Sequence, residues 1–171
     1  MRKKIILSVL LLSLLFTVNC GYKLSGSGKY IPKDLKSIAI PDFDNKTTEY
    51  RAEQFVTFAI RDEFIKRSRM VLREKVEEAD ALLEGSILKF DVTPVNYSSL
   101  GSVDMYKVTI KINVKLVNLK NNSIIYEKKN MSFTGNYEVG SSDFFSQESE
   151  ALKKISVKFS ASIVSAILEN Y

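Results

Sequence analysis

The residue best placed to do chemistry in this 171-residue chain is Cys20, its single cysteine. Cys20 follows an almost unbroken apolar run over residues 5–18, and cationic residues occupy positions 2–4. A lone cysteine has no disulfide partner within its own chain, so in a secreted protein its thiol is buried, bonded to another molecule or chemically modified. The position of Cys20 at the end of a hydrophobic leader favours modification.

The leader has the layout of a signal peptide. Its apolar run of 14 residues is too short for a hydrocarbon core that needs about 20 residues, so we predict a signal peptide over residues 1–19. An uncleaved N-terminal anchor is the alternative. A cysteine at this point resembles a bacterial lipobox, in which Val18 fits the usual pattern and Thr17 and Asn19 depart from it. That resemblance makes Cys20 the acylated first residue of the mature protein, held on a membrane by two or three acyl chains.

Composition narrows the classes of function. Without the leader the chain keeps 152 residues, enough for one compact domain. The leader contains three of the 25 Lys and Arg residues and none of the 20 Asp and Glu residues, which lowers the net charge from +5 to +2. This near balance removes the main argument for nucleic-acid binding, and we predict no nucleic-acid partner.

Catalytic and metal chemistry have little support. The chain has no histidine, so it cannot supply a Ser-His-Asp triad, a Cys-His pair or a usual zinc site by itself. Adjacent acids such as Asp62 and Glu63 point in different directions and are typical of a solvated surface. Asp42, Asp44 and Asn45 lack the glycine and closing glutamate of a calcium loop, and we interpret them as a turn. We therefore predict no catalytic residue, metal or cofactor.

The first half of the mature chain predicts a tether, a strand and a helix. Residues 20–34 are rich in glycine and should form a lipidated N-terminal tether, and residues 35–41 read as a short strand ended by proline. After a polar turn at residues 42–48, residues 49–68 show helical periodicity, with Thr48 as the expected N-cap. The predicted core positions of this helix are Ala52, Phe55, Val56, Ala59, Ile60 and Phe64.

The second half predicts strands and a final helix. Residues 70–75 and 81–96 read as strands, the second closed by Pro94, and a hairpin turn at residues 118–123 leads to a partner strand over residues 124–137. Between the second strand and the hairpin turn, residues 103–116 alternate between apolar and polar side chains, strictly so from Tyr106. This is expected of a strand with one face on the core and one in water. The apolar positions are Tyr106, Val108, Ile110, Ile112, Val114 and Leu116, and the wet face carries Lys107, Lys111 and Lys115.

The closing helix should start near Ser141 or Ser142 and present Leu152, Ile155, Phe159 and Ile163 to the core, with Lys153, Lys154, Ser160 and Ser162 opposite. These elements predict an α+β domain over residues 35–171. Two helices should pack on one face of a mixed, mostly antiparallel sheet of four to five strands, and the other face of the sheet should stay open.

Three short motifs resemble the LPS-assembly lipoproteins, the LptE family, over nearly the whole mature chain. They are Cys20-Gly21-Tyr22 with Leu24 and Gly26, residues 38–41 (IAIP) with Phe43 and Asn45, and residues 79–85 (ADALLEG). The order and length of the predicted elements agree as well. The alternative class of protein is a regulatory or chaperone-like outer-membrane lipoprotein, such as a synthase activator or a secretin pilotin. An enzyme is a distant third.

The resemblance implies a lipoprotein of the cell outer membrane that faces the periplasm, plugs the β-barrel LptD and helps deliver lipopolysaccharide to the cell surface. It also implies that the protein binds lipopolysaccharide, whose phosphates need cationic side chains. Lys107, Lys111 and Lys115 are the candidates for that contact. The competing interpretation is that these lysines only keep an exposed strand soluble.

Overall fold

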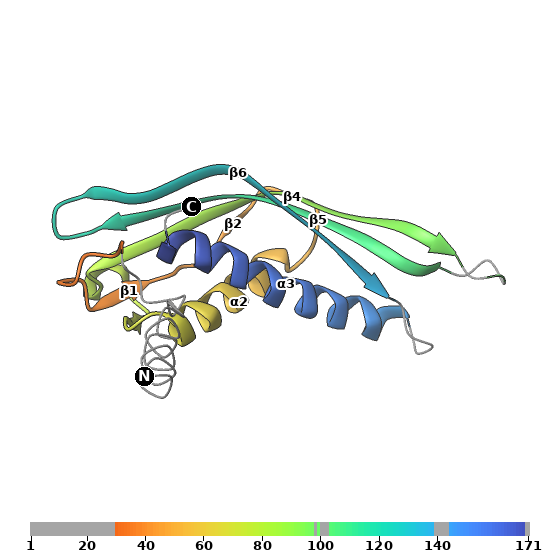
Figure 1. Ribbon diagram of the computed structural model, residues 1–171, viewed down its shortest axis with the longest axis horizontal. Helices are drawn as coiled ribbons and strands as arrows, with labels where there is room; N and C mark the ends of the chain where they lie inside the picture. The colour runs from red at the N-terminus through yellow and green to blue at the C-terminus, as the bar shows by residue number, and fades with distance from the viewer. Residues whose placement is uncertain (1–29, 98, 100–102, 139–143, 170–171) are drawn as a thin grey trace, which may run out of the picture.

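The computed structural model describes residues 30–97, 99, 103–138 and 144–169. It has two layers, a six-stranded sheet and two helices beneath one of its faces (Figure 1). The predicted signal peptide, Cys20 and the cap residues Ser141 and Ser142 lie outside the described residues. No helix within the described residues is both long enough and apolar enough to cross a membrane.

Short parallel strands form one half of the sheet. Strand β1 (Ser37–Ala39) lies between β3 (Val71–Arg73) and the start of β4 (Ala81–Tyr97), and it is parallel to both. Strand β2 (Asp44–Asn45) also pairs with β4, further along it. A single 3-10 turn, η1 (Val76–Glu78), connects β3 to β4.

Long antiparallel strands form the rest of the sheet. Strand β5 (Val103–Asn118) pairs with β4 on one side and with β6 (Ser123–Glu138) on the other. The predicted alternation along β5 is confirmed, because its apolar side chains from position 108 to 116 lie against the helices while their neighbours stay at least partly exposed. The buried positions, each at most 2% exposed, are Val108, Ile110, Ile112, Val114 and Leu116.

Helices α2 (Ala52–Arg67) and α3 (Phe144–Glu169) pack against each other under the sheet. Arg67 at the end of α2 reaches α3, where its guanidinium donates to the Ala161 carbonyl at 3.1 Å and to the Ser165 hydroxyl. The core therefore lies between the sheet and both helices. Its largest fully buried side chains include Phe43, Phe64, Ile60, Leu83, Ile87, Ile163 and Ile167.

The predicted α+β class with two helices on one sheet face is confirmed, and the sheet has six strands where four to five were expected. The additional strand, β2, lies inside the segment predicted as a turn. Pro94 lies within β4 and does not close it. On the side of β4 away from β5, the pairing strands β1 and β2 both end before Pro94. The missing N–H of Pro94 therefore interrupts no hydrogen bonding on that side.

The start of α2 differs from the prediction. The N-cap is Arg51, with a φ of 68° and no side-chain cap, rather than Thr48. Asn45 explains the delay, because its side-chain amide donates to the Glu49 carbonyl at 2.9 Å and to the Glu53 carboxylate at 2.8 Å. These bonds hold the preceding residues in a turn, so the helix begins only after it.

Two predictions about which helix side chains face the core also need correction. Phe55 is half-buried rather than part of the core, and the Arg51 guanidinium lies 5.6 Å from its ring centre. Ser160, expected on the wet face of α3, is only 1% exposed. Its hydroxyl donates to the Val157 carbonyl at 2.8 Å, so the buried Ser160 side chain is satisfied within the helix.

Two residues of the 79–85 motif hold the fold together at one end of the sheet. The Asp80 carboxylate accepts hydrogen bonds from the backbone N–H groups of Lys36 (2.7 Å) and Ser37 (3.0 Å) and lies 3.2 Å from the Lys120 ammonium. The bond from the Lys36 N–H contributes most to lowering the pKa of Asp80 to about 2. Gly85 is needed for space, since a Cβ there would lie 2.3 Å from the buried Phe43 ring.

Candidate functional site

The candidate site is the sheet face that points away from the helices, called here the outer face. Register partners in a sheet share a face, so β5 aligns the outward residues of its two neighbours with its own. The predicted lysines Lys107, Lys111 and Lys115 all lie on this face. Its other members are Glu84, Ser86, Lys89, Asp91 and Thr93 from β4, Thr109 and Asn113 from β5, and Glu127, Ser132, Thr134 and Asn136 from β6.

The three lysines have different surroundings. The Lys115 ammonium lies 3.1 Å from the Glu84 carboxylate on β4, and Glu127 is its register partner on β6. Lys115 is therefore compensated by Glu84, while the Glu127 carboxylate pairs with Lys129 at 3.6 Å. Lys107 lies between two uncharged register partners, Thr93 and Asn136.

Lys111 faces a like charge. Its register partner on β4 is Lys89, and its partner on β6 is Ser132. Lys89 has a carboxylate at 3.1 Å, that of Asp91. Like charges directly opposite each other destabilise a sheet, and the one Asp91 carboxylate offsets only one of the two positive charges. The remaining charge favours a bound anion.

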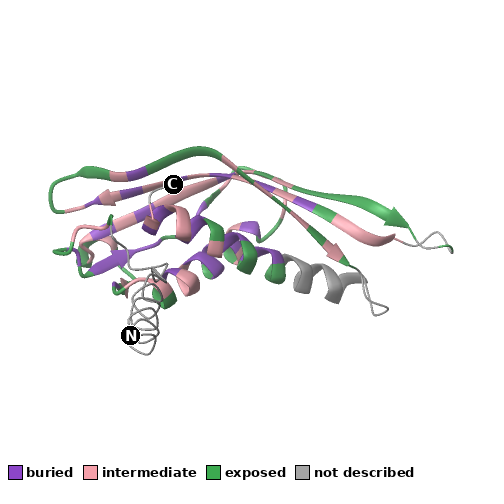
Figure 2. Cartoon of the chain, viewed as in Figure 1, coloured by how far each residue is buried: buried purple, intermediate pink, exposed green. Residues whose placement is uncertain are grey.

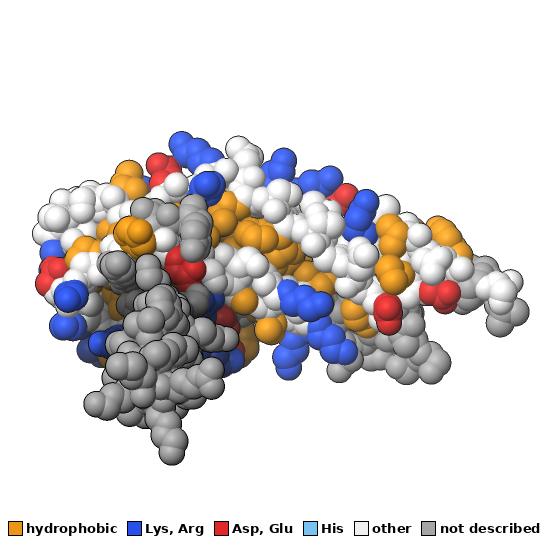
Figure 3. All heavy atoms as spheres, viewed as in Figure 1, with side chains coloured by type: hydrophobic (Ala, Val, Ile, Leu, Met, Phe, Trp, Pro, Cys, Tyr) orange, Lys and Arg blue, Asp and Glu red, His pale blue; other side chains and the backbone are white. Residues whose placement is uncertain are grey.

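Lys89, Lys107 and Lys111 together are called the distal cationic patch. Lys107 and Lys111 are four residues apart, which places them about 13 Å from each other along the strand. Lys89 was missed from the sequence because a register shift between Ile87 and Lys89 changes the phase of β4. Figure 3 shows Lys and Arg side chains, with acids between them, along the top of the molecule where the sheet lies.

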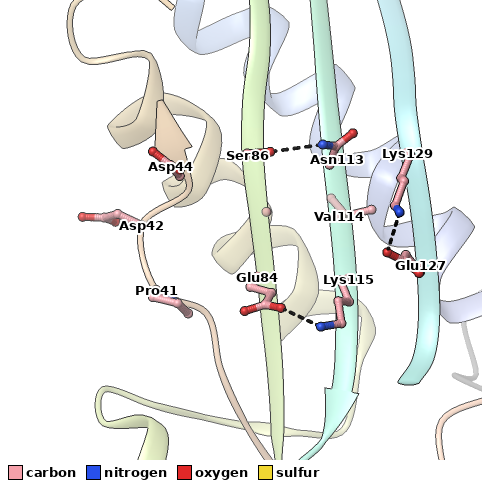
Figure 4. Close-up of a pocket in the computed structure, with 11 residues that line it drawn as sticks. Pro41, Asp42, Asp44, Glu84, Ser86, Asn113, Val114, Lys115, Glu127 and Lys129 are labelled. Atoms are coloured by element: carbon pink, nitrogen blue, oxygen red, sulfur yellow. Dashed lines mark hydrogen bonds and ion pairs between the residues drawn. The ribbon is translucent and has the colours of Figure 1, made fainter. Parts of the chain in front are cut away.

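A shallow depression of about 470 Å³ borders the patch on the outer face (Figure 4). Four carboxylates and two ammonium groups line it, and each carboxylate has an ion-pair partner. Glu84 pairs with Lys115 and Glu127 with Lys129, while Asp42 pairs with Arg61 and Asp44 with Lys46. Polar groups such as the Ser86 hydroxyl and the Asn113 amide, 3.3 Å apart, also line it. The carboxylates are those of Asp42, Asp44, Glu84 and Glu127.

The chemistry of the outer face thus changes along the sheet. The depression is lined by ion pairs and uncharged polar groups and suits hydroxyl groups, whereas the distal cationic patch suits phosphate. No group of three acidic or thiol ligands that could hold a metal ion occurs among the described residues. The face can therefore bind an elongated ligand that carries both hydroxyl groups and negative charge.

The architecture, a sheet with one open face and two helices behind it, recurs in solved proteins of low identity. Protein XCC0632 from Xanthomonas campestris is 13% identical with a TM-score of 0.53, over 78% of this chain and 84% of that one. A PelC dodecamer from Paraburkholderia phytofirmans is 12% identical with a TM-score of 0.50, over 78% and 87%. Protein CT253 from Chlamydia trachomatis is 9% identical with a TM-score of 0.51, over 80% and 99%. These likenesses define the fold class alone.

The family follows from the sequence match. The model of the lipopolysaccharide-assembly family, LptE, matches residues 35–167, so the chain belongs to that family. This confirms the resemblance carried by the short motifs. No curated protein matches the chain.

Proposed function

We propose that this protein is a lipid-anchored lipoprotein of the cell outer membrane that plugs and supports the β-barrel LptD and helps deliver lipopolysaccharide to the cell surface. Two observations support the proposal. The chain belongs to the lipopolysaccharide-assembly family, and its leader ends at a single cysteine, Cys20. The folded domain then faces the periplasm, with acyl chains on Cys20 holding it at the membrane.

The outer face is the proposed lipopolysaccharide surface. The opposed pair Lys89 and Lys111 carries this part of the proposal, because Asp91 offsets only one of their two charges and a bound phosphate would neutralise the other. Lys107 can contact a second negative group about 13 Å further along β5. The polar depression can accept sugar hydroxyl groups of the same molecule.

The structure changes which lysines should matter. Lys115 was predicted together with Lys107 and Lys111, but the carboxylate of Glu84 already compensates it at 3.1 Å. Lys89 also has a carboxylate at 3.1 Å, that of Asp91, but it lies directly opposite a second lysine, Lys111, and therefore joins the proposed set. Lys115 thereby becomes a matched control, since it has the same side chain on the same face of the sheet.

The test uses the detergent-extracted protein and purified lipopolysaccharide. Replacing Lys89, Lys107 and Lys111 with Gln should weaken lipopolysaccharide binding by at least about tenfold, whereas Lys115→Gln should change it little. The affinity of the wild type should fall as salt is added, because salt screens exposed charges. Co-purification of LptD should survive in both variants, since plugging depends mainly on shape.

Other results would change the assignment. Unchanged lipopolysaccharide binding in the folded triple variant would reduce the lysines to a solubility device. Loss of LptD with lipopolysaccharide binding intact would assign the outer face to the protein partner. Recovery of a different envelope protein, such as a synthase or a secretin, would favour the regulatory or chaperone-like alternative.

The lipid anchor has its own test. Replacing Cys20 with Ala should abolish labelling of the protein by radioactive fatty acid and release it from the membrane fraction. Full labelling of the Cys20→Ala protein would show that the acyl chains are attached elsewhere or that the leader is an uncleaved anchor.

A further inference from the structure

One side of helix α2 carries large apolar side chains that are exposed to solvent. Phe58 is 69% exposed and Ile65 is 48% exposed. They are two helical turns apart in the sequence, so they lie on the same side of α2, about 10.5 Å from each other. These two residues are called here the α2 stripe. Aligned apolar side chains on a surface indicate a contact site more strongly than isolated ones do.

The other sides of α2 already have partners. Its core side includes Phe64, which is 0% exposed. Towards the segment before β2, the Thr57 hydroxyl accepts a hydrogen bond from the Phe43 N–H at 2.9 Å. A third side packs against α3. The α2 stripe is therefore the side of the helix that the described residues leave to solvent.

The N-terminal segment of the chain joins the domain beside the end of α2 that carries Ile65. The Lys36 carbonyl accepts a hydrogen bond at 2.8 Å from the N–H of Val71, which begins the strand that follows α2. Leu35 is 4% exposed, and Ile31 packs against the core. The chain is thus attached to the domain from Ile31 onward, and the residues before it start close to the α2 stripe.

We propose that residues 21–29, called here the strap, run back along α2 and cover the α2 stripe. The length of the strap allows this contact. Its nine residues can span about 30 Å when extended, which exceeds the distance between the two residues of the stripe. The strap leads into Tyr30, directly before the point where the chain is attached to the domain.

The sequence of the strap also suits this surface. Its apolar residues, Tyr22 and Leu24, alternate with polar ones, so an extended strap presents both on the same side. They are about 7 Å apart in such a strand, so Leu24 can cover Ile65 while the longer Tyr22 side chain reaches Phe58. Two glycines lie between Leu24 and the domain, where the chain has to turn back along the helix.

Docking of the strap changes how far the domain can stand from a membrane. With the strap free, residues 21–30 allow a separation of up to about 35 Å between Cys20 and the domain. With the strap docked, α2 lies next to the acyl chains and the outer face of the sheet points away from them. This consequence rests on the proposed acylation of Cys20, whereas the docking itself does not.

Disulfide trapping in the full-length protein in membranes tests the contact directly. Leu24→Cys combined with Ile65→Cys should form a bond within one chain under mild oxidation, seen as a change in gel migration that reduction reverses. Leu24→Cys combined with Lys66→Cys is the matched control, because Lys66 is exposed on the same turn but points about 100° away from Ile65. A docked strap should favour Ile65 at least about tenfold in rate, whereas a free tether would reach both thiols alike. The Leu24→Cys single variant gives the background from Cys20.

Proteolysis provides a second test that needs no new thiol. Trypsin can cut after Lys29, which separates the strap from the domain. Replacing Phe58 and Ile65 together with Ser should speed this cleavage at least about fivefold, because a docked strap is cut only when it opens. Tyr50→Ser is the control, since Tyr50 is 82% exposed but precedes the opposite end of α2. All three positions are exposed, and unchanged thermal unfolding verifies that the variants fold.

Each outcome decides the proposal. Equal cross-linking at Ile65 and Lys66 would overturn it, as would an unchanged rate of cleavage after Lys29 in the double Ser variant. A cross-linked species of twice the chain mass would assign the α2 stripe to a second copy instead. Loss of LptD without faster cleavage would assign the stripe to the barrel. Absence of fatty-acid labelling would refute the lipid anchor alone, so failure of the proposed function stays distinguishable from failure of the strap.

Discussion

The two halves of strand β4 differ in how far their side chains are buried. Its first half has strands on both sides and helices beneath, and Leu83 and Ile87 are 0% exposed. Its second half continues past α2 (Figure 1), and every residue from Asp91 to Tyr97 is exposed (Figure 2). Val95 is 44% exposed and Tyr97 58% exposed. Apolar side chains therefore maintain the core in the proximal half, whereas in the distal half they are left on the surface.

The largest expected effect compares one residue from each half of β4. Leu83→Ala should lower the free energy of unfolding by about 2–5 kcal/mol, because it leaves a cavity among packed side chains. Val95→Ala should change it by less than about 0.5 kcal/mol. Chemical denaturation of both variants measures the difference. Equal losses would mean that the distal half is packed in solution, for example within an oligomer.

Two glycines sharpen the same comparison. Gly85→Ala should lower the free energy of unfolding by about 1–3 kcal/mol, because the new methyl group overlaps the Phe43 ring. Gly135→Ala in the distal half has free space and should stabilise the protein by up to about 1 kcal/mol through reduced backbone entropy. Thermal unfolding of the two variants measures the difference. Equal decreases in melting temperature for both variants would contradict the comparison.

The acid stability of the proximal half should depend on Asp80. Its folded pKa of about 2 lies below its model-peptide value of 3.8, so the ionised form contributes stability above about pH 4. That contribution should disappear as the pH falls from about 4 to about 2. Asp80→Asn should be less stable at neutral pH and should lose less stability over that interval. Denaturation curves of the wild type and of Asp80→Asn, measured from pH 7 to 2, test this prediction. An equal loss of unfolding free energy in both proteins would reject it.

The smallest effect concerns the outer face. Lys111→Gln should raise the free energy of unfolding by a few tenths of a kcal/mol, because it removes the repulsion with Lys89. Lys115→Gln should lower it by up to about 1 kcal/mol, because it removes the pair with Glu84. Both changes should shrink in high salt. A loss of stability in Lys111→Gln would show that Lys111 has a stabilising partner.

Regular periodicity made much of the fold predictable from the sequence. Strand β5 alternates without interruption because each of its residues belongs to one face of a continuous ladder, so Ile110 and Lys111 were assigned correctly to opposite faces. The helical spacing of Ala52, Val56 and Ile60 likewise matched their burial. These patterns lie within single segments of the sequence, so they can be recognised without knowing which strands or helices pack beside them.

The features that were missed depend on partners distant in sequence. Asp44 and Asn45 favour turns, and only pairing with Ser86 and Ile87 makes them a strand. The opposition of Lys89 and Lys111 depends on a register shift, which no single-strand pattern reveals. For the candidate site, the lysines of β5 could be located from the sequence, but the pairing of Lys115 with Glu84 on β4 could not.

The contact between Arg67 and the last helix has a consequence for how the chain reaches its folded state. Arg67 bonds to the Ser165 hydroxyl across 98 positions of sequence, and Ile163, Val164 and Leu168 complete the core. Contacts between such remote segments form late, because a long loop must close before they stabilise the fold. A chain synthesised from its N-terminus would thus have α2 and the underside of the sheet uncovered until α3 is made. Folding would be completed only once the last turns of α3 are available to pack against α2.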